Sequence, residues 1–421
     1  MKKIAILGFG CAGYHCAKTL REEGYEGAIH VFSDTKLPPY NPMLTTYYAG
    51  HKLHREGLFP FGGLREIASS LSLTLHTGSP VVRLDALGKA VELADGSRHT
   101  YDKALIATGA RAFIPPLPHM PSRDVYYMRT PEDAEALRAR LDRGDVKRAV
   151  VVGASMVGIK VAELFQRAGA QCTLADLAPS LFPLAAVPEI GAELARRVEA
   201  KGVSLRFGVG LTALEEAERG LVASFGAERV EADAVGLAIG TRTNLDFLDK
   251  SGPAVDRGVL VNQRMETSLP DLYAAGDCAR GNTVQRGPPQ IIGLWANAGY
   301  QGVTAGAAML GRQVRYPGNM LHNITHFMDM DFIGFGDVRA TGEVLRFSRD
   351  GFTLYAVRQN GKLALVNIVD NHAISGIIKN YMMRKFMGHE EPISPMQEAI
   401  LLRNGLTPAM INALEQPQGG R

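Results

Sequence analysis

The chain has 421 residues, which accommodates roughly two to four domains with sizeable hydrophobic cores. Hydrophobic residues make up 46% of it and charged residues 21%, as in an ordinary globular protein. The formal net charge of +3 is too small to indicate a nucleic-acid or membrane-surface partner, and four cysteines are too few for a secreted disulfide scaffold. We therefore expect a cytoplasmic protein that binds no nucleic acid.

Two apolar stretches need separate interpretation. The run after the N-terminal Met-Lys-Lys is broken at Gly8, too early for the hydrophobic part of a signal peptide. The uncharged run between Arg286 and Arg312 contains prolines, glycines and amides. That composition predicts a buried helix rather than a membrane span.

A glycine-rich turn opens the chain. A predicted buried strand at 3–7 is followed by Gly8, Gly10 and Gly13 in the pattern G-x-G-x-x-G, and then by a helical pattern. The first glycine permits a tight turn, the second lets the backbone approach a pyrophosphate, and the third allows close helix–strand packing. The next predicted strand ends near Asp34, which is placed to bind the ribose hydroxyls of an adenosine. This order predicts a dinucleotide site.

A second turn of the same kind follows a proline-rich linker. It contains Gly153, Ser155 and Gly158, so that a serine replaces the middle glycine. The strand after its helix ends at Asp176, which favours a ribose with free hydroxyls. No arginine follows in residues 177–180, and we therefore expect NADH to be preferred over NADPH.

Each module closes with a strand that ends in glycine, at Gly109 and at Gly240. A further apolar strand ends in Gly276-Asp277, where the chain is expected to return to its first module. An aspartate at the carboxyl end of such a strand can accept hydrogen bonds from a polyol such as a ribityl chain. Considered alone, Asp277 would more simply cap a turn, and it is the surrounding motifs that favour the ligand.

From residue 319 onward the pattern changes. Strands are expected at 324–333, 343–347, 352–357 and 363–369, with turns at Asp350-Gly351 and Asn360-Gly361 and three helices after them. This predicts a small α+β domain. His322 and His326 have the spacing of a helical metal site, but they are expected to lie on a strand, and no metal site is predicted.

The motifs, in this order and spacing, resemble the two-dinucleotide-fold flavoprotein reductases of the pyridine nucleotide–disulfide oxidoreductase superfamily over nearly the whole chain. Ferredoxin or rubredoxin reductases, NADH oxidases and the flavin domain of nitrite reductase are the most similar types. The resemblance implies an α/β protein with two Rossmann-like domains, the second inserted in the first, and a C-terminal α+β interface domain that usually dimerises. The expected divisions are 1–115 and 242–318 for FAD, 116–241 for NAD(P), and 319–421 for the interface domain.

Motifs and resemblance together assign the cofactor contacts. The residues expected to bind FAD are Gly8, Gly10, Gly13, Asp34, Val82, Thr108, Gly109, Gly276, Asp277 and Trp295. Those expected to bind NADH are Gly153, Ser155, Gly158, Asp176 and Gly240. The uncharged helix that starts near residue 294 would direct its N-terminal dipole at the flavin and stabilise its anionic reduced form.

The chain departs from the family pattern at two places. Residues 41–45 stand where relatives keep a redox cysteine, and no cysteine lies between Cys16 and Cys172, so a thiolate relay is not expected. Cys11 and Cys16 are spaced on a helix so that they point apart, which excludes a bridge between them. Lys160 replaces a glutamate that relatives hold near the nicotinamide, and it is either a candidate catalytic residue or a solvated helix lysine.

The expected activity is hydride transfer from NADH to FAD, followed by electron transfer to a carrier protein such as a ferredoxin or rubredoxin. Two alternatives stay open: an NADH oxidase or small-molecule reductase, and a flavoprotein subunit or NAD-sensing partner-binding protein. A basic cluster could dock an acidic carrier or could be a solvated helix face; its members are Arg138, Arg140, Arg143, Lys147 and Arg148.

Overall fold

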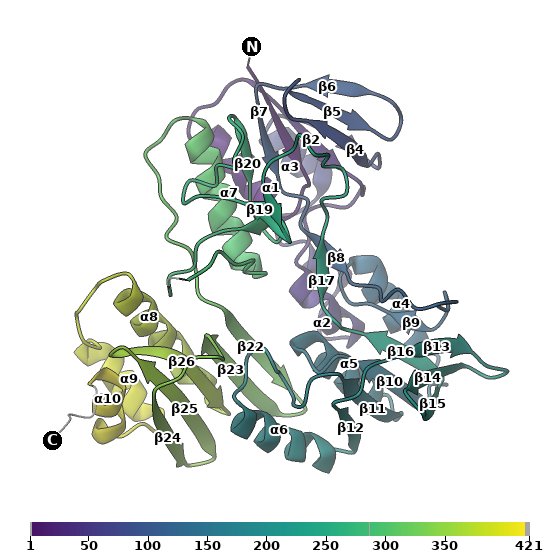
Figure 1. Ribbon diagram of the computed structural model, residues 1–421, viewed down its shortest axis with the longest axis vertical. Coiled ribbons are helices and arrows are strands. Elements are labelled where there is room, and N and C mark those ends of the chain that lie inside the picture. The colour runs from purple at the N-terminus through teal and green to yellow at the C-terminus, as the bar shows by residue number, and fades with distance from the viewer. Residues whose placement is uncertain (1, 286, 417–421) are drawn as a thin grey trace. The chain divides into compact units, whose positions relative to one another are not determined.

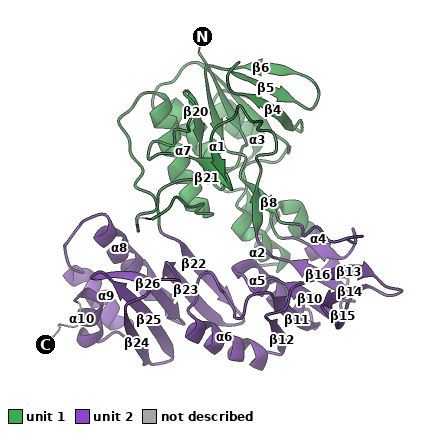
Figure 2. Ribbon diagram, viewed as in Figure 1, with its two compact units in different colours: residues 1–113, 128–135, 241–319 green, residues 114–127, 136–240, 320–421 purple. Residues whose placement is uncertain are grey.

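The computed structural model describes residues 2–285 and 287–416 (Figure 1). Its described residues fall into two compact units, shown in Figure 2. Unit 1 is built from residues 1–113, 128–135 and 241–319, and unit 2 from residues 114–127, 136–240 and 320–421. The chain thus leaves unit 1 and returns to it, and the module with the second glycine-rich turn shares a unit with the C-terminal part.

Unit 1 is organised around a parallel sheet of five strands in the order β20-β7-β1-β2-β3. The strands are β1 (Lys3–Leu7), β2 (Ala28–Ser33), β3 (Leu73–Thr77), β7 (Lys103–Ile106) and β20 (Leu272–Ala274). Because all five are parallel, their carboxyl ends meet at one edge, and β20 brings Gly276 and Asp277 to the same edge as the first glycine-rich turn.

Two helices of unit 1 pack closely against each other, α1 (Cys11–Glu22) and α7 (Trp295–Met309) (Figure 1). Glycines of α7 make this approach possible. A Cβ atom at Gly302 would clash with the carbonyl oxygen of Ala12, and one at Gly306 would lie 2.9 Å from that of Cys16. The uncharged run is therefore a buried helix, as predicted. Among the described residues, no helix is long and apolar enough to cross a membrane.

Smaller elements complete unit 1. Helix α3 (Leu64–Ser70) precedes β3, and an antiparallel meander of β4 (Val81–Asp85), β5 (Ala90–Leu93) and β6 (Arg98–Thr100) follows it. The chain leaves unit 1 shortly after β8 (Ala110–Ala112) and re-enters it for the last time at β17 (Thr241–Thr243). These two strands pair with each other in antiparallel fashion. The remaining elements are η1 (Pro42–Leu44), α2 (Thr45–Ala49), η2 (Arg55–Leu58), β18 (Val255–Asp256), β19 (Gly258–Leu260) and β21 (Ala279–Arg280).

The nucleotide module of unit 2 repeats the plan of unit 1, with a parallel sheet in the order β12-β11-β10-β16-β9. Helices α5 and α6 alternate with its strands, an antiparallel meander with a buried central strand adds three more strands, and α4 precedes β10. The bounds are β9 (Val125–Tyr126), α4 (Pro131–Asp142), β10 (Arg148–Val152), α5 (Met156–Arg167), β11 (Gln171–Asp176), α6 (Pro188–Ala200), β12 (Val203–Phe207), β13 (Ala213–Glu216), β14 (Leu221–Phe225), β15 (Glu228–Ala232) and β16 (Ala234–Leu237).

The C-terminal part of unit 2 is an antiparallel sheet, β22-β23-β26-β25-β24, followed by helices. Its elements are β22 (His322–Phe327), β23 (Met330–Gly336), β24 (Glu343–Arg349), β25 (Phe352–Gln359), β26 (Lys362–Val369), η3 (His372–Ile374), α8 (Ser375–Phe386), α9 (Pro395–Arg403) and α10 (Pro408–Glu415). Together with the two parallel sheets, this architecture confirms the predicted α/β fold.

One strand prediction in this part was wrong. The single strand expected at 324–333 is a hairpin, because Met328 and Asp329 both adopt left-handed backbone conformations, with φ of 47° and 61°. Neither residue is a glycine, and so the sequence carries no glycine signal for the turn. The predicted turns at Asp350-Gly351 and Asn360-Gly361 are confirmed.

We predict that Gly302→Ala lowers the free energy of unfolding by about 1–3 kcal/mol, because the added methyl group overpacks the contact between α7 and α1. Urea unfolding followed by far-UV circular dichroism measures the change. Gly376→Ala in α8 is the matched control, since its Cβ would meet no atom within 4 Å. Equal stability of the two variants would contradict the close approach of the helices.

Candidate functional site

The first glycine-rich turn has the geometry of a phosphate-binding turn. Gly8 has φ of +99°, and its N–H donates to the carbonyl oxygen of Phe32 at 2.7 Å. A Cβ at Gly8 would clash with the carbonyl oxygen of Ala107, and one at Gly13 with that of Gly8 itself. Gly10 caps α1 without a side-chain hydrogen bond, and a Cβ there would meet nothing within 4 Å. Two glycines therefore serve the packing of the turn, and Gly10 leaves the helix N-terminus open to a pyrophosphate.

Asp277 lies just past β20 and is held by partners from distant parts of the chain. Its Oδ2 accepts a hydrogen bond from Nη2 of Arg129 at 2.7 Å, and Nε of Arg129 also donates to the carbonyl oxygen of Ala110 at 2.9 Å. The preceding residue is anchored as well, since the N–H of Gly276 donates to Oε1 of Gln301 on α7 at 2.7 Å. Sequence reasoning missed Arg129, because 148 positions separate it from Asp277 and no local motif marks it.

Trp295 begins α7 and carries a buried hydrogen-bond donor that a ligand could use. Its ring stacks on Phe61 with a centroid distance of 5.4 Å, and Phe61 stacks on Tyr14 at 3.9 Å. The indole Nε1 is buried and has no hydrogen-bond partner among the described residues. A buried donor without a partner is costly, and a polar ring edge such as that of a flavin would satisfy it. Phe61 was not predicted, since a phenylalanine between Pro60 and Gly62 gives no functional signal.

Of the other expected FAD contacts, Asp34, Thr108 and Gly109 follow strands of the parallel sheet, and Val82 lies on the meander. Thr108 donates through Oγ1 to the carbonyl oxygen of Asn244 at 2.6 Å, and Gly109, with φ of +65°, follows it. Asp34 is exposed directly after β2. Val82 is 53% exposed at an irregularity in the pairing of β4 with β5. The open N-terminus of α1, the carboxylate of Asp277 and the unsatisfied indole N–H of Trp295 together fit an FAD molecule.

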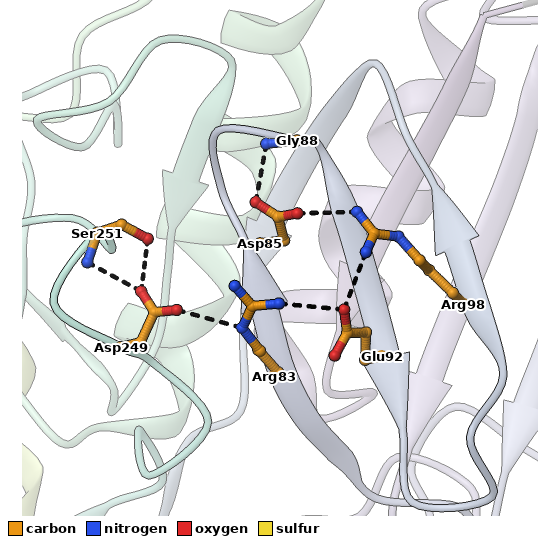
Figure 3. A network of polar contacts seen from close by, with 7 residues as sticks. All are labelled: Arg83, Asp85, Gly88, Glu92, Arg98, Asp249 and Ser251. Carbon is orange, nitrogen blue, oxygen red and sulfur yellow. Dashed lines mark hydrogen bonds and ion pairs between the residues drawn. The ribbon is translucent and has the colours of Figure 1, made fainter.

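An alternating network of charges lies on the meander of β4, β5 and β6, beginning at Arg83, the residue after Val82 in the chain (Figure 3). Arg83 bridges Asp249 at 3.3 Å and Glu92 at 3.2 Å, and Arg98 bridges Glu92 to Asp85. The backbone N–H of Gly88 and the guanidinium of Arg98 lower the pKa of Asp85. Because these groups are exposed, the network contributes little to stability. Its consequence is geometric: it joins the meander to the segment around residue 249.

The second glycine-rich turn repeats the geometry of the first. Gly153 has φ of +113°, and a Cβ there would clash with the carbonyl oxygen of Ala238, while one at Gly158 would clash with that of Gly153. Ser155 caps α5: its Oγ accepts from the N–H of Gly158 at 3.2 Å and donates to the carbonyl oxygen of Ala238 at 3.1 Å. The serine in place of the middle glycine therefore keeps the turn closed by its own hydrogen bonds.

Asp176 borders this turn. Its two carboxylate oxygens accept from the N–H groups of Ala154 at 2.5 Å and Ala178 at 2.7 Å. These bonds fix the carboxylate at the carboxyl end of β11, the position that selects a ribose in such folds. Gly240 ends the module with φ of +106°, and a Cβ there would meet nothing within 4 Å.

Lys160 is 6% exposed, so the alternative of a solvated lysine was wrong. Its Nζ donates to Oε2 of Glu163 at 2.6 Å and to the carbonyl oxygen of His326 at 2.7 Å. Both partners belong to unit 2, and the ammonium group of Lys160 is buried against them rather than exposed to solvent. These two hydrogen bonds thus tie Lys160 into the structure of unit 2.

All four cysteines are free and buried. Burial raises the pKa of Cys172 to about 12, that of Cys278 to about 11 and that of Cys16 higher still. Burial, with a smaller contribution from the charge of Asp277, raises the pKa of Cys11 to about 12. Since only a thiolate is an effective nucleophile, none of the four is activated near neutral pH.

The histidines and the basic cluster are engaged structurally. His322 and His326 lie on β22, as expected, and in the described part of the chain no group of residues could hold a metal ion. Burial and the charge of Lys379 lower the pKa of His322 to about 4.

In the basic cluster, Arg140 pairs with Asp124 and Asp145, and Arg148 pairs with Glu231 and Asp233. These pairs neutralise part of the cluster.

The protein-family model described as pyridine nucleotide-disulphide oxidoreductase matches residues 2–302. The chain belongs to this family. It is therefore a flavin-dependent NAD(P)H oxidoreductase. The family and the enzyme class that the sequence predicted are confirmed. Residues 303–421 lie beyond the family match.

Two curated relatives and two solved structures show the similarity in detail. The chain is 30% identical over 281 residues to nitric oxide reductase FlRd-NAD(+) reductase of Escherichia coli O7:K1, covering 66% of this chain and 73% of that one. It is 30% identical over 282 residues to rhodocoxin reductase of Rhodococcus erythropolis, covering 66% and 64%. The chain thus spans just under two thirds of the second relative.

The ferredoxin reductase for the CYP199A2 system of Rhodopseudomonas palustris is 25% identical, with a TM-score of 0.81 over 90% of this chain and 94% of that one. The water-forming NADH oxidase of Lactobacillus brevis has a TM-score of 0.85 at 20% identity, over 92% and 91%. At that identity the second likeness concerns the fold alone.

We predict that Asp277→Asn weakens FAD binding on the order of 10-fold, because the charge-assisted hydrogen bonds of this carboxylate become neutral ones. The flavin content of the purified protein and the dissociation constant of FAD measure the effect. Asp246→Asn is the control, since Asp246 forms an exposed pair with Arg111 in the same unit. Full FAD affinity in Asp277→Asn would remove Asp277 from the site.

We also predict that replacing Cys16, Cys172 and Cys278 together by alanine leaves flavin reduction by NADH within a few-fold of wild type. Their raised pKa values keep the thiols protonated and inactive. Cys11 is tested separately, because it lies in the FAD turn. Anaerobic titration provides the second measurement: a thiolate–flavin charge-transfer band at half reduction would reveal a redox thiol.

Proposed function

We propose that this protein transfers a hydride from NADH to bound FAD and passes the electrons on to a small carrier protein of the ferredoxin or rubredoxin kind. The observation that carries the proposal is the pair of matching nucleotide turns, one beside Asp277 and the orphaned Trp295 indole, the other beside Asp176. The buried, protonated cysteines support an exit of electrons from the flavin without a thiol relay.

The residues of unit 1 have separable tasks toward FAD, which when bound supplies the ring that accepts the hydride. Gly10 and the N-terminus of α1 receive the pyrophosphate, and Asp34 and Val82 receive the adenosine part. Asp277 accepts hydrogen bonds from the ribityl hydroxyls. The N-terminus of α7, with the Trp295 indole, places positive charge and a donor at the polar edge of the ring.

The residues of unit 2 orient the nicotinamide nucleotide. The N-terminus of α5, capped by Ser155, receives the phosphates, and Gly153 and Gly158 hold the turn closed. Asp176 accepts from the ribose hydroxyls, and its negative charge disfavours the phosphate of NADPH at the same place. This charge is the reason for the proposed preference for NADH.

The choice of a carrier protein as acceptor rests on the curated relatives. Rhodocoxin reductase is named for a protein partner, and the ferredoxin reductase at 25% identity is named for another. We further propose a cytoplasmic homodimer that uses the C-terminal part. Helix α9 supports the dimer, because Met396 is 74% exposed and Ile400, one turn on, is 38% exposed. The four free cysteines support a reducing compartment.

The function is tested by anaerobic stopped-flow reduction with NADH, followed by mixing with candidate acceptors. The expected result is fast reduction of the flavin and fast reoxidation by a ferredoxin or rubredoxin. Rapid oxygen consumption by the purified protein alone would favour an oxidase instead. A long-lived complex of reduced flavin with NAD⁺ and slow turnover with every acceptor would favour a sensor or subunit.

We predict that Asp176→Ala lowers kcat/KM for NADH on the order of 10-fold and narrows its advantage over NADPH, because the ribose loses its acceptor and the negative charge disappears. Steady-state kinetics with both nucleotides measure the ratio. Leu177→Ala is the control, since Leu177 is adjacent and 74% exposed. Faster flavin reduction by NADPH than by NADH in the wild type would contradict the assignment.

A further inference from the structure

The hairpin turn between β22 and β23 is bound by the helix that follows the second nucleotide turn. Oε1 of Glu163 accepts a hydrogen bond from the N–H of Met328 at 3.1 Å. One turn earlier on α5, Nζ of Lys160 donates to the carbonyl oxygen of His326 at 2.7 Å. The helix thus binds one donor and one acceptor of the same turn, and we call these four residues the hairpin clasp.

The clasp contains a buried ion pair. The side chain of Lys160 is 8% exposed and that of Glu163 is 2% exposed, with 2.6 Å between Nζ and Oε2. Arg167 adds a second cation, at 2.8 Å from Oε1 of Glu163. Burial alone would raise the pKa of Glu163, but the hydrogen bond and charge of Lys160, with smaller contributions from Met328 and Arg167, lower it, so the carboxylate is ionised at neutral pH.

A buried ion pair is a poor source of stability, because desolvation of two charges offsets much of their attraction. Apolar side chains of similar size would pack α5 against the hairpin as well or better. They could not bind the backbone N–H of Met328 and the carbonyl oxygen of His326 at the same time. The ion pair of Lys160 and Glu163 therefore selects one position of the hairpin relative to α5.

We propose that Lys160 and Glu163 are positioning residues for NADH: through the hairpin clasp, the C-terminal part of the chain sets the orientation of α5 and so of its nucleotide-binding first turn. Lys160 lies five residues after the cap Ser155, about 8 Å along the axis at 1.5 Å per residue. A helix transmits a displacement over that length. This inference rests on the proposed binding of NADH at α5.

The C-terminal sheet has a second attachment to the nucleotide module, independent of the clasp. Asn367 of β26 is fully buried; its Oδ1 accepts from the N–H of Val187 at 2.9 Å, and its Nδ2 donates to the carbonyl oxygen of Ala185 at 2.8 Å. Both partners of Asn367 precede α6 and lie outside α5. Variants of the clasp are therefore expected to keep the sheet attached and to fold.

The test uses full-length, FAD-loaded protein and compares Lys160→Met, the double variant Lys160→Met/Glu163→Met, and Lys201→Met. Lys201 is the matched control, because it pairs at 3.0 Å with Asp329 of the same hairpin through exposed side chains and does not belong to α5. Calorimetry measures the dissociation constant of NAD⁺, thermal unfolding measures stability, and hydrogen exchange measures protection of residues 326–331.

Lys160→Met is expected to lose both stability and NAD⁺ affinity, since it leaves Glu163 with a buried negative charge that only Arg167 balances. The double variant regains stability because neither buried charge remains, but its NAD⁺ dissociation constant stays raised on the order of 10-fold. NAD⁺ protects the hairpin amides in the wild type and in Lys201→Met, and not in the double variant.

Two results would overturn the inference in different ways. If the folded double variant binds NAD⁺ as the wild type does, the clasp is structural only and the proposed function stands. If the wild type binds no NAD⁺ and its flavin is not reduced by NADH, the proposed function falls, and the positioning role falls with it.

Discussion

The structure depends on the same backbone contact made twice. In each nucleotide module the first glycine of the turn lies against a carbonyl oxygen at the end of a neighbouring strand, Ala107 for Gly8 and Ala238 for Gly153. No side chain fits between them, so each helix starts directly above its sheet and points its unpaired N–H groups at the carboxyl edge. In unit 1 this edge also receives Asp277, because β20 pairs with β7 and ends just before it.

Burial determines which side chains near the first glycine-rich turn can react. Thiols are present close to the site, since Sγ of Cys11 donates to the carbonyl oxygen of Trp295 at 3.3 Å. Burial keeps them protonated and thus unreactive. The unsatisfied group is instead the indole N–H of Trp295, a buried hydrogen-bond donor at the start of an uncharged helix. This combination fits a flavoprotein in which the cofactor carries the redox chemistry.

Charge is used differently in the two units. On the meander of unit 1, arginines and carboxylates alternate at the surface, where solvent screens them and geometry is their main effect (Figure 3). In unit 2 the ion pair of Lys160 and Glu163 is buried, where removing one partner leaves an uncompensated charge. The buried pair lies on a helix inside the family match and binds a hairpin that follows the end of that match.

The sequence by itself determined the two nucleotide turns, their acidic strand ends, the uncharged buried helix and the α/β class. Each of these depends on residues close together in the chain, such as Gly8 with Gly13, so spacing alone carries the signal. The family and its enzyme class followed from their order. The absence of a cysteine from residues 41–45 could also be read directly.

Only the tertiary structure decided how distant residues meet. Arg129 reaches Asp277 across 148 positions, and Phe61 stacks between Tyr14 and Trp295 from three separate segments. Periodicity could not indicate that Lys160 is buried, because its partner His326 lies 166 positions away. The hairpin at Met328 was missed for a related reason: its left-handed turn is stabilised by α5 rather than by a glycine of its own. Local pattern specifies local geometry, whereas the balance of buried charges and hydrogen bonds exists only once the chain has folded.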